Sequence, residues 1–143
     1  MLTTKLTNAE LIGALASCGH GDKILITDGN YPVNTAVNEN TKVIDLGIGP
    51  DLPTVTAVLD GLLEISNFEK AEVMVPEDKN EPTPSIFGAF EKQLDGLGLT
   101  KLGRHDFYDA CVADPNLKIA VHTGEGRLFG NLLLTIAPAT TAK

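Results

Sequence analysis

Two kinds of segment alternate along the chain in their pattern of apolar and polar positions. Short runs rich in β-branched and other apolar residues, such as KILIT at 23–27, are typical of buried strands. Between these runs, apolar residues recur every three or four positions, as Leu11, Ile12 and Leu15 do, which is typical of one face of a helix. We expect helices at 8–18, 54–65, 85–94 and 107–112, and strands at 23–27, 42–46, 72–75, 99–104, 117–122 and 132–136.

The order of these elements indicates the fold class. Strands alternate with helices over most of the chain, which predicts an α/β protein with a largely parallel or mixed central sheet and helices on both faces. The last two strands are joined by residues 123–131, a connection too short for a helical crossover, so they either form a hairpin or lie apart in a mixed sheet. Thr7, three residues before Glu10, has the position of a helix N-cap. No repeat or long linker divides the 143 residues, and we expect one domain, 1–143.

The composition excludes several classes of function. The net charge is −8, and the 11 Lys and Arg residues form no basic run, so nucleic acid is not an expected partner. The N-terminus lacks the apolar stretch of a signal peptide, and no apolar run approaches the roughly 20 residues that cross a bilayer. Two cysteines, Cys18 and Cys111, are too few for a disulfide framework. We therefore expect a cytoplasmic protein without a membrane partner.

Candidate chemistry lies in the loops next to the predicted strands, since ligands of α/β sheets bind at strand ends. His20 stands in a glycine-flanked loop before the first strand, and Asp28 follows that strand directly. Because an unperturbed imidazole titrates near pH 6.5, His20 can act as an acid and as a base close to neutrality. Asp28 can orient that imidazole or bind hydroxyl groups of a ligand. The alternative is a helix C-cap in which the His20 ring is solvated.

The glycine-rich segment 123–131 is a second candidate. Its three glycines allow a ligand to approach the backbone closely. Glu125, Arg127, Phe129 and Asn131 supply a carboxylate, a cation, an aromatic face and an amide. This set suits a neutral sugar, which presents C–H faces and hydroxyl groups. The alternative is a simple turn between two strands.

Two further polar segments are weaker candidates. Arg104 comes after a predicted strand and is followed by His105, and the same residues also fit the start of a helix. Glu77 and Asp78 follow another strand, where a solvated loop is the alternative. The chain lacks a dinucleotide fingerprint and a phosphate-binding loop. Its histidines lack the spacing of a zinc site, so no metal site is expected.

Taken in order, these motifs resemble the D-ribose pyranase / L-fucose mutarotase family over nearly the whole chain. They are Gly19-His20-Gly21-Asp22 with Asp28 and Pro32, Arg104 with Phe107-Tyr108, and Thr123-Gly124-Glu125 with Phe129-Gly130-Asn131. The arginine at 104 and the Thr-Gly-Glu and Gly-Asn motifs make the chain similar to the fucose branch. Two positions differ: Phe129 stands where the family usually has tyrosine, and Asn30 stands where the fucose type usually has histidine.

The resemblance implies a ribose pyranase-like fold and a cofactor-free isomerase of a free monosaccharide such as L-fucose or D-ribose. It implies that His20 is the catalytic acid, and that Asp28, Arg104 and the tripeptide Phe129, Gly130 and Asn131 bind the sugar. It also implies a ring-shaped homo-oligomer, commonly a decamer, with sites at the contacts between subunits.

The reaction implied is the exchange of anomers, and of pyranose and furanose forms, through the open-chain aldehyde. One proton reaches the ring oxygen and another leaves the anomeric hydroxyl, so a positioned acid–base pair suffices and no cofactor is required. The alternative function is a non-catalytic monosaccharide-binding or sugar-transport accessory protein, because Phe129 lacks the tyrosine hydroxyl. A structural assembly protein with an inactive site is a third interpretation.

Overall fold

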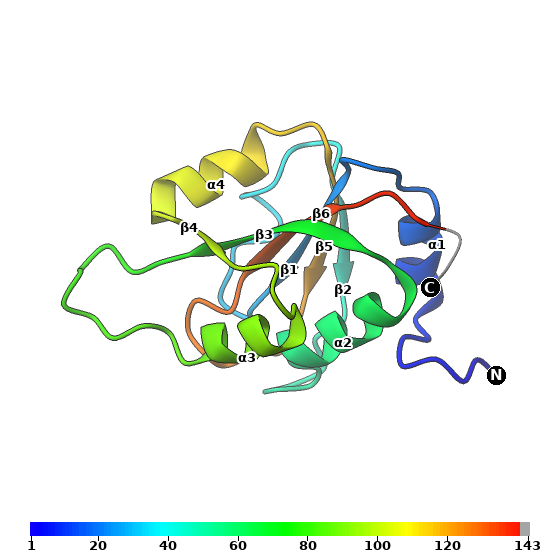
Figure 1. Cartoon of the computed structure of the whole chain (residues 1–143), viewed down its shortest axis with the longest axis horizontal. Helices are drawn as coiled ribbons and strands as arrows, with labels where there is room; N and C mark the ends of the chain where they lie inside the picture. The colour runs from blue at the N-terminus through cyan, green and yellow to red at the C-terminus, as the bar shows by residue number, and fades with distance from the viewer. Residues whose placement is uncertain (141–143) are drawn as a thin grey trace.

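One mixed sheet of six strands forms the centre of the protein, in the order β2–β5–β1–β6–β3–β4 (Figure 1). The computed structural model describes residues 1–140. The strands are β1 (Lys23–Thr27), β2 (Lys42–Asp45), β3 (Phe68–Met74), β4 (Thr100–Leu102), β5 (Leu117–His122) and β6 (Leu132–Ile136). Each strand and helix that the sequence predicts is present, which confirms the predicted α/β class.

The strand directions decide between a hairpin and a mixed sheet for the two C-terminal strands. β2, β5 and β1 are mutually parallel, β3 is parallel to β4, and β6 is antiparallel to both of its neighbours, β1 and β3. Five strands therefore run in one direction and β6 alone runs in the other. Because β1 lies between β5 and β6, these two strands form no hairpin. Their connector, residues 123–131, crosses the carboxyl end of β1 and comes to lie beside Asp28.

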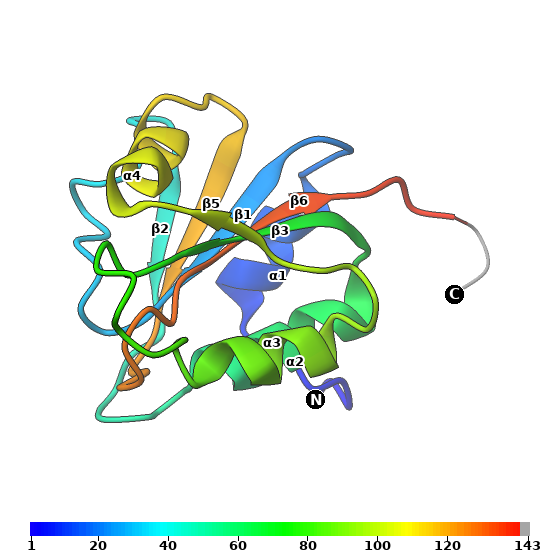
Figure 2. The same cartoon turned by 60° about the vertical axis from the view of Figure 1, so that its left-hand side comes forward.

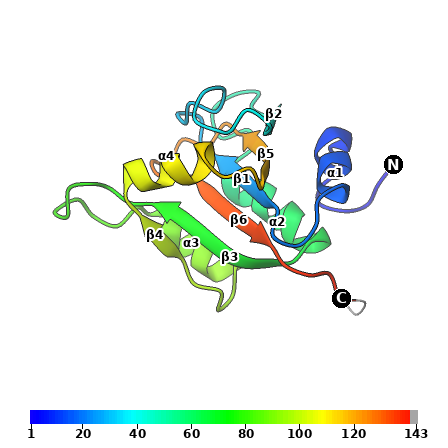
Figure 3. The same ribbon diagram turned by 90° about the horizontal axis from the view of Figure 1, so that it is seen from above.

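Three helices cover one face of the sheet and one covers part of the other (Figures 2 and 3). They are α1 (Ala9–Ala16), α2 (Val55–Ile65) and α3 (Ile86–Gln93) on the first face, and α4 (Arg104–Val112) on the second. Since side chains alternate along a strand, Ile24 and Ile26 belong to the core under α1–α3, and Leu25 belongs to the core under α4. No helix within residues 1–140 is long and apolar enough to cross a membrane.

Several boundaries differ from the sequence prediction, most clearly in β3, α4 and α1. β3 begins at Phe68, four residues before the predicted start, because the prediction followed the run at 72–75, and the earlier part of the strand carries the exposed polar residues Glu69 and Lys70. α4 begins at Arg104, so this residue does not end a strand, and the alternative of a helix start for this segment is confirmed. The N-cap of α1 is Asn8, not Thr7, and its side-chain oxygen accepts a backbone hydrogen bond at 2.8 Å.

Candidate functional site

A cavity of about 170 Å³ lies at the edge of the sheet where the five same-direction strands end. Its walls come from the segment after β1, the end of β3, the first two turns of α4 and the connector before β6. The lining residues are Asp28, Asn30, Tyr31, Met74, Arg104, Tyr108, Leu128, Phe129 and Asn131. Four residues predicted to bind a ligand, Asp28, Arg104, Phe129 and Asn131, thus share one cavity, and we take it as the candidate site.

Asp28 ties two loops of the cavity together. Its Oδ1 accepts hydrogen bonds from the backbone amides of Asn30 and Tyr31, both at 3.0 Å. Its Oδ2 accepts a hydrogen bond from the Gly130 amide at 3.2 Å, and its own backbone amide donates to Asn131 Oδ1 at 2.9 Å. The carboxylate is almost fully buried. This side chain therefore holds the segment after β1 and the connector before β6 together.

The pKa of the Asp28 carboxyl lies above its ordinary value. Burial is the largest cause, and the charge of Glu125 adds to it, while the three backbone amides lower the pKa without cancelling the rise. A carboxyl in this state keeps its proton to higher pH than an exposed aspartate, which brings it closer to the range useful for proton exchange near neutrality. Asp28 therefore suits both proton exchange and hydroxyl binding.

The connector presents Phe129, Gly130 and Asn131 to the cavity in an unusual backbone conformation. Phe129 has φ +60°, in the left-handed region that bulky residues rarely adopt. A Cβ atom on Gly130 would lie 3.1 Å from both the Arg127 carbonyl and Glu125 Cγ, so only glycine fits without displacement. Because Asn131 Oδ1 is used by Asp28, the Nδ2 group of Asn131 is the donor that remains for a ligand.

Aromatic side chains and one cation form a further wall. The Tyr31 hydroxyl donates to the carbonyl of Ala36 at 2.7 Å, and burial raises the pKa of Tyr31, so this hydroxyl stays protonated. The rings of Tyr31 and Tyr108 have centroids 5.5 Å apart. The Arg104 guanidinium lies 6.0 Å from the Tyr108 ring centroid, at the limit of a cation–π contact. Arg104 is thus the cationic donor of the cavity.

His20 lies outside this cavity, at the other end of β1. It precedes β1 while Asp28 follows it, and the five residues of β1 span roughly 17 Å at the usual rise of a strand. His20 Nε2 is 3.0 Å from Glu69 Oε1, and the His20 side chain is 56% exposed. Within one chain, the structure therefore brings Asp28, Arg104 and residues 129–131 together and leaves His20 apart from them.

The other polar candidates also lie outside the cavity. His105 is 89% exposed, with Nε2 at 3.7 Å from Glu77 Oε1. His122, to which the sequence analysis gave no role, ends β5 with Nδ1 at 3.2 Å from Asp45 Oδ1. Its Nε2 lies 3.3 Å from the Gly29 carbonyl. Within residues 1–140, no three His, Cys, Asp or Glu side chains gather as ligands for a metal ion.

Five lining residues were not among the predicted site residues. Asn30 and Tyr108 were named only in comparison with the family motifs, and Tyr31, Met74 and Leu128 were missed. Met74 ends β3, and its position at a strand end was a signal that could have found it. Leu128 lies within the glycine-rich segment already singled out, but an apolar residue there gave no sign of facing a ligand. Tyr31 carried no signal at all, because its place in the cavity results from the turn that Asp28 caps.

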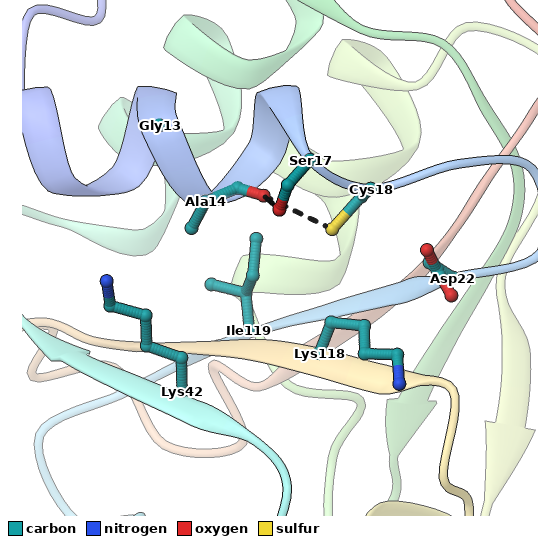
Figure 4. A pocket seen from close by; sticks show the side chains of 8 residues that line it. All are labelled: Gly13, Ala14, Ser17, Cys18, Asp22, Lys42, Lys118 and Ile119. Atoms are coloured by element: carbon teal, nitrogen blue, oxygen red, sulfur yellow. Dashed lines mark hydrogen bonds between the residues drawn. The ribbon is translucent and has the colours of Figure 1, made fainter.

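A larger cavity, of about 470 Å³, lies between α1 and the strands β2 and β5 (Figure 4). Ser17 and Cys18 at the end of α1 face Lys42 and Lys118 on the strands. The Ser17 hydroxyl and the Cys18 thiol both donate to the Ala14 carbonyl. Burial raises the pKa of Cys18, so the thiol is protonated at neutral pH. This cavity has no aromatic face and holds none of the predicted site residues, and we assign the site to the smaller cavity.

The sequence of this chain matches a known protein family over nearly its whole length. The model of the RbsD / FucU transport protein family matches residues 1–138. The chain belongs to this family. The family recognised from the ordered sequence motifs is thereby confirmed.

Relatives that carry two different names are similar to this chain. A D-ribose pyranase from Lactiplantibacillus plantarum is 31% identical, with 94% of this chain and 95% of the relative covered. A fucose mutarotase from Mus musculus is also 31% identical, with 91% of this chain and 88% of the relative covered. Since both are equally similar, the predicted closeness to the fucose branch stays a prediction.

Solved structures of RbsD / FucU proteins share the fold. The structure of Bacillus subtilis RbsD complexed with D-ribose matches with a TM-score of 0.78 at 25% identity, covering 98% of this chain and 100% of that chain. The crystal structure of a fucose mutarotase from Streptococcus pneumoniae in complex with L-fucose has a TM-score of 0.81 at 24% identity, with the same coverage. The second likeness shows the fold alone, and it confirms the expected ribose pyranase-like architecture.

Proposed function

We propose that this protein is a cofactor-free isomerase that interconverts the anomers of a free monosaccharide such as L-fucose or D-ribose. The observation that carries the proposal is the cavity itself, which gathers Asp28, Arg104, Phe129 and Asn131 from separate segments of the chain. Relatives named D-ribose pyranase and fucose mutarotase match this chain over nearly its full length. The substrate class follows from the lining, because hydroxyl groups need donors and acceptors and a sugar C–H face needs an aromatic ring.

The residues of the cavity divide the work of ring opening. Arg104 and the Nδ2 group of Asn131 donate hydrogen bonds to sugar hydroxyls, and the Phe129 ring packs on the C–H face. The Asp28 carboxyl, with its raised pKa, anchors a hydroxyl and exchanges a proton with the anomeric oxygen. None of these roles includes a redox step or a group transfer, so the reaction as proposed needs no cofactor.

His20 is the proposed catalytic acid, and it acts on the cavity of a neighbouring copy. The length of β1 separates His20 from Asp28 of its own chain, whereas the imidazole, paired with Glu69 and 56% exposed, lies at the surface where another subunit can meet it. This arrangement requires a homo-oligomer in which each site is shared between two chains, and the family resemblance makes a ring-shaped decamer the expected form. Light scattering or native mass spectrometry measures the size directly, and a monomer at working concentration rules out the shared site.

The enzyme claim is tested by exchange NMR of anomer interconversion on a panel of aldoses. His20→Ala should lose most of the acceleration, and His105→Ala, which removes an exposed histidine outside the cavity, should retain it. Mixed oligomers of His20→Ala and Asp28→Asn chains should regain part of the activity that each variant lacks alone. Equal rates with and without wild-type protein on every sugar eliminate the enzyme claim, and an unchanged rate in His20→Ala eliminates His20.

A second candidate function is a non-catalytic monosaccharide-binding or sugar-transport accessory protein. Phe129 favours it, because its ring carries no hydroxyl that could donate to the sugar or relay a proton. The matching family model is itself described as a transport protein family. Sugar-induced NMR shifts without any acceleration of anomer exchange decide for this function.

We further place the protein in the cytoplasm, as a single sugar mutarotase domain of residues 1–143. Both thiols, Cys18 and Cys111, are free, as expected where thiols stay reduced. Fractionation of the native cells, with detection of the protein in the cytoplasmic fraction, tests this placement.

A further inference from the structure

Glu125 carries a buried carboxylate beside the cavity, and the proposed reaction gives this carboxylate no role. Its Oε1 accepts a hydrogen bond from Arg127 Nη2 at 2.7 Å, and its Oε2 accepts from Arg127 Nε and from the Arg127 backbone amide, both at 3.2 Å. Glu125 is 1% exposed. Burial raises its pKa, but the hydrogen bonds and charge of Arg127 together lower the pKa more, so Glu125 stays ionised. A buried charge with this many donors has a fixed position.

The first turn of α2 anchors this ion pair. Arg127 Nη2 also donates to Thr56 Oγ1 at 3.1 Å, and the backbone amide of Val55 lies close enough to Glu125 to lower the pKa of its carboxyl. The neighbouring Gly126 amide donates to Asp51 Oδ1 at 3.0 Å, just before the same helix. The carboxylate lies at the amino end of α2, where the helix dipole favours a negative charge. Residues 125–127 are thus fastened to a helix that takes no part in the cavity.

From this anchor, Glu125 reaches both loops that form the cavity. A Cβ on Gly130 would lie 3.1 Å from Glu125 Cγ, so the side chain of Glu125 is packed directly against the backbone of Gly130. The backbone carbonyl of Glu125 accepts a hydrogen bond from the Gly29 amide at 3.0 Å. Gly130 in turn donates to Asp28. One residue therefore supports the segment after β1 and the segment before β6.

We propose that Glu125 is the positioning residue of this site: its buried carboxylate, fixed on Arg127 and α2, sets where residues 129–131 stand relative to Asp28. Glu125 does not line the cavity, so it acts through the groups that do. The proposal rests on the proposed function, because sugar binding is its main readout. Its charge also acts on Asp28, whose other charged or titratable neighbours in the cavity are Arg104, Tyr31 and Tyr108.

The test is Glu125→Gln, which keeps the shape of the side chain but places an NH2 group among the N–H donors of Arg127. The sugar Kd, measured by calorimetry, should rise by about tenfold or more, the size expected when buried hydrogen-bonding groups lose their partners. The rate at saturating sugar should change much less. Arg127→Lys, which keeps the cation but loses the forked hydrogen bonds, should shift the Kd in the same direction by a smaller factor.

Asp114→Asn is the matched control. Asp114 forms a partly buried ion pair with Lys23 at 2.8 Å and accepts the Asn116 amide at 2.8 Å, so its loss removes interactions of the same kind. These residues lie near the start of β1, away from the cavity. Asp114→Asn should leave the sugar Kd unchanged. Crystal structures should show residues 129–131 displaced in Glu125→Gln and in place in Asp114→Asn.

The pH dependence of sugar affinity separates positioning from general stability. Since the charge of Glu125 raises the Asp28 pKa, Glu125→Gln should move the Asp28-dependent change in affinity to lower pH, and Asp114→Asn should not. Equal effects of the two variants on Kd and on the pH profile overturn the proposal. If the wild-type protein binds no sugar, the proposed function fails, and the crystal structures alone judge Glu125: unmoved residues 129–131 overturn the positioning role.

Discussion

Asn131 accepts a hydrogen bond from the backbone amide of Asp28 at 2.9 Å, although 103 positions separate the two residues. The bond exists because β6 lies antiparallel to β1, which sets the residue before β6 beside the residue after β1. The Asp28 carboxylate in turn accepts a hydrogen bond from the backbone amide of Gly130, the residue before Asn131. The two groups proposed to hold a ligand are thus also the groups that hold the two loops, so we expect binding and local stability to depend on the same side chains.

Asp28→Asn should lose both stability and sugar binding. An amide at this position has one oxygen for three backbone donors, and its NH2 group faces an N–H. The free energy of unfolding in urea should fall by about 1–3 kcal/mol, and sugar binding should be lost. Asp78→Asn is the control, because Asp78 is exposed and accepts one backbone hydrogen bond in a loop. Similar stability losses in the two variants contradict the prediction.

Stability should depend on pH with opposite signs at Asp28 and Asp114. The pKa of Asp28 is raised, so its stabilising contribution is complete below the ordinary pKa of aspartate and is lost as pH rises through the folded-state value. At Asp114 burial raises the pKa, but the Lys23 hydrogen bond and charge and the Asn116 amide lower it more. Its contribution is therefore present above the ordinary value and lost as pH falls.

Urea unfolding across pH measures both signs. Above about pH 4, the ordinary range for aspartate, the free energy of unfolding should rise more steeply with pH in Asp28→Asn than in the wild type. Below that pH, the free energy of unfolding of Asp114→Asn should fall less steeply with decreasing pH than that of the wild type. Curves that run parallel to that of the wild type would show that neither carboxyl contributes as described.

Gly130→Ala should displace the connector. The added methyl meets the Arg127 carbonyl and Glu125 Cγ at 3.1 Å, and a backbone carbonyl cannot yield as a flexible side chain does. We expect a loss of about 1–3 kcal/mol in the free energy of unfolding, typical of overpacking, together with weaker sugar binding. Gly88→Ala is the control, because a Cβ in this helical position meets nothing within 4 Å. The free energy of unfolding of Gly88→Ala should rise by about 0.5–1 kcal/mol, and a fall in this variant would contradict the prediction.

Phe129→Tyr should increase the rate of anomer exchange. The new hydroxyl lies on a ring that already lines the cavity, and a hydrogen bond of about 0.5–1.5 kcal/mol to the sugar or to a transferred proton corresponds to roughly a two- to tenfold gain. Phe129→Leu keeps an apolar side chain without the aromatic face and should weaken sugar binding. Exchange NMR on both variants decides, and an unchanged rate in Phe129→Tyr shows that the hydroxyl position has no role.

The local elements were predictable because each carries its own periodicity, whereas the cavity arises from contacts across the sheet. Asp28 and the segment 123–131 were recognised as strand-end residues, but nothing in their spacing shows that the connector crosses β1. Arg104 was assigned to the end of a strand, and its place in the cavity comes from opening α4. His20 and Asp28 flank the same strand and are therefore close in sequence. The length of the extended strand nevertheless holds them apart in space.

The position of β6 has a consequence for how the chain acquires its structure during synthesis. Among residues 1–140, β6 follows every other strand in the sequence, yet it lies inside the sheet between β1 and β3. Until residues 132–136 leave the ribosome, the edges of β1 and β3 have no partner, and two half-sheets remain unjoined. Closure of the sheet therefore waits for the synthesis of β6, and a nascent chain stalled before β6 exposes two open strand edges, on which a chaperone or another chain can dock.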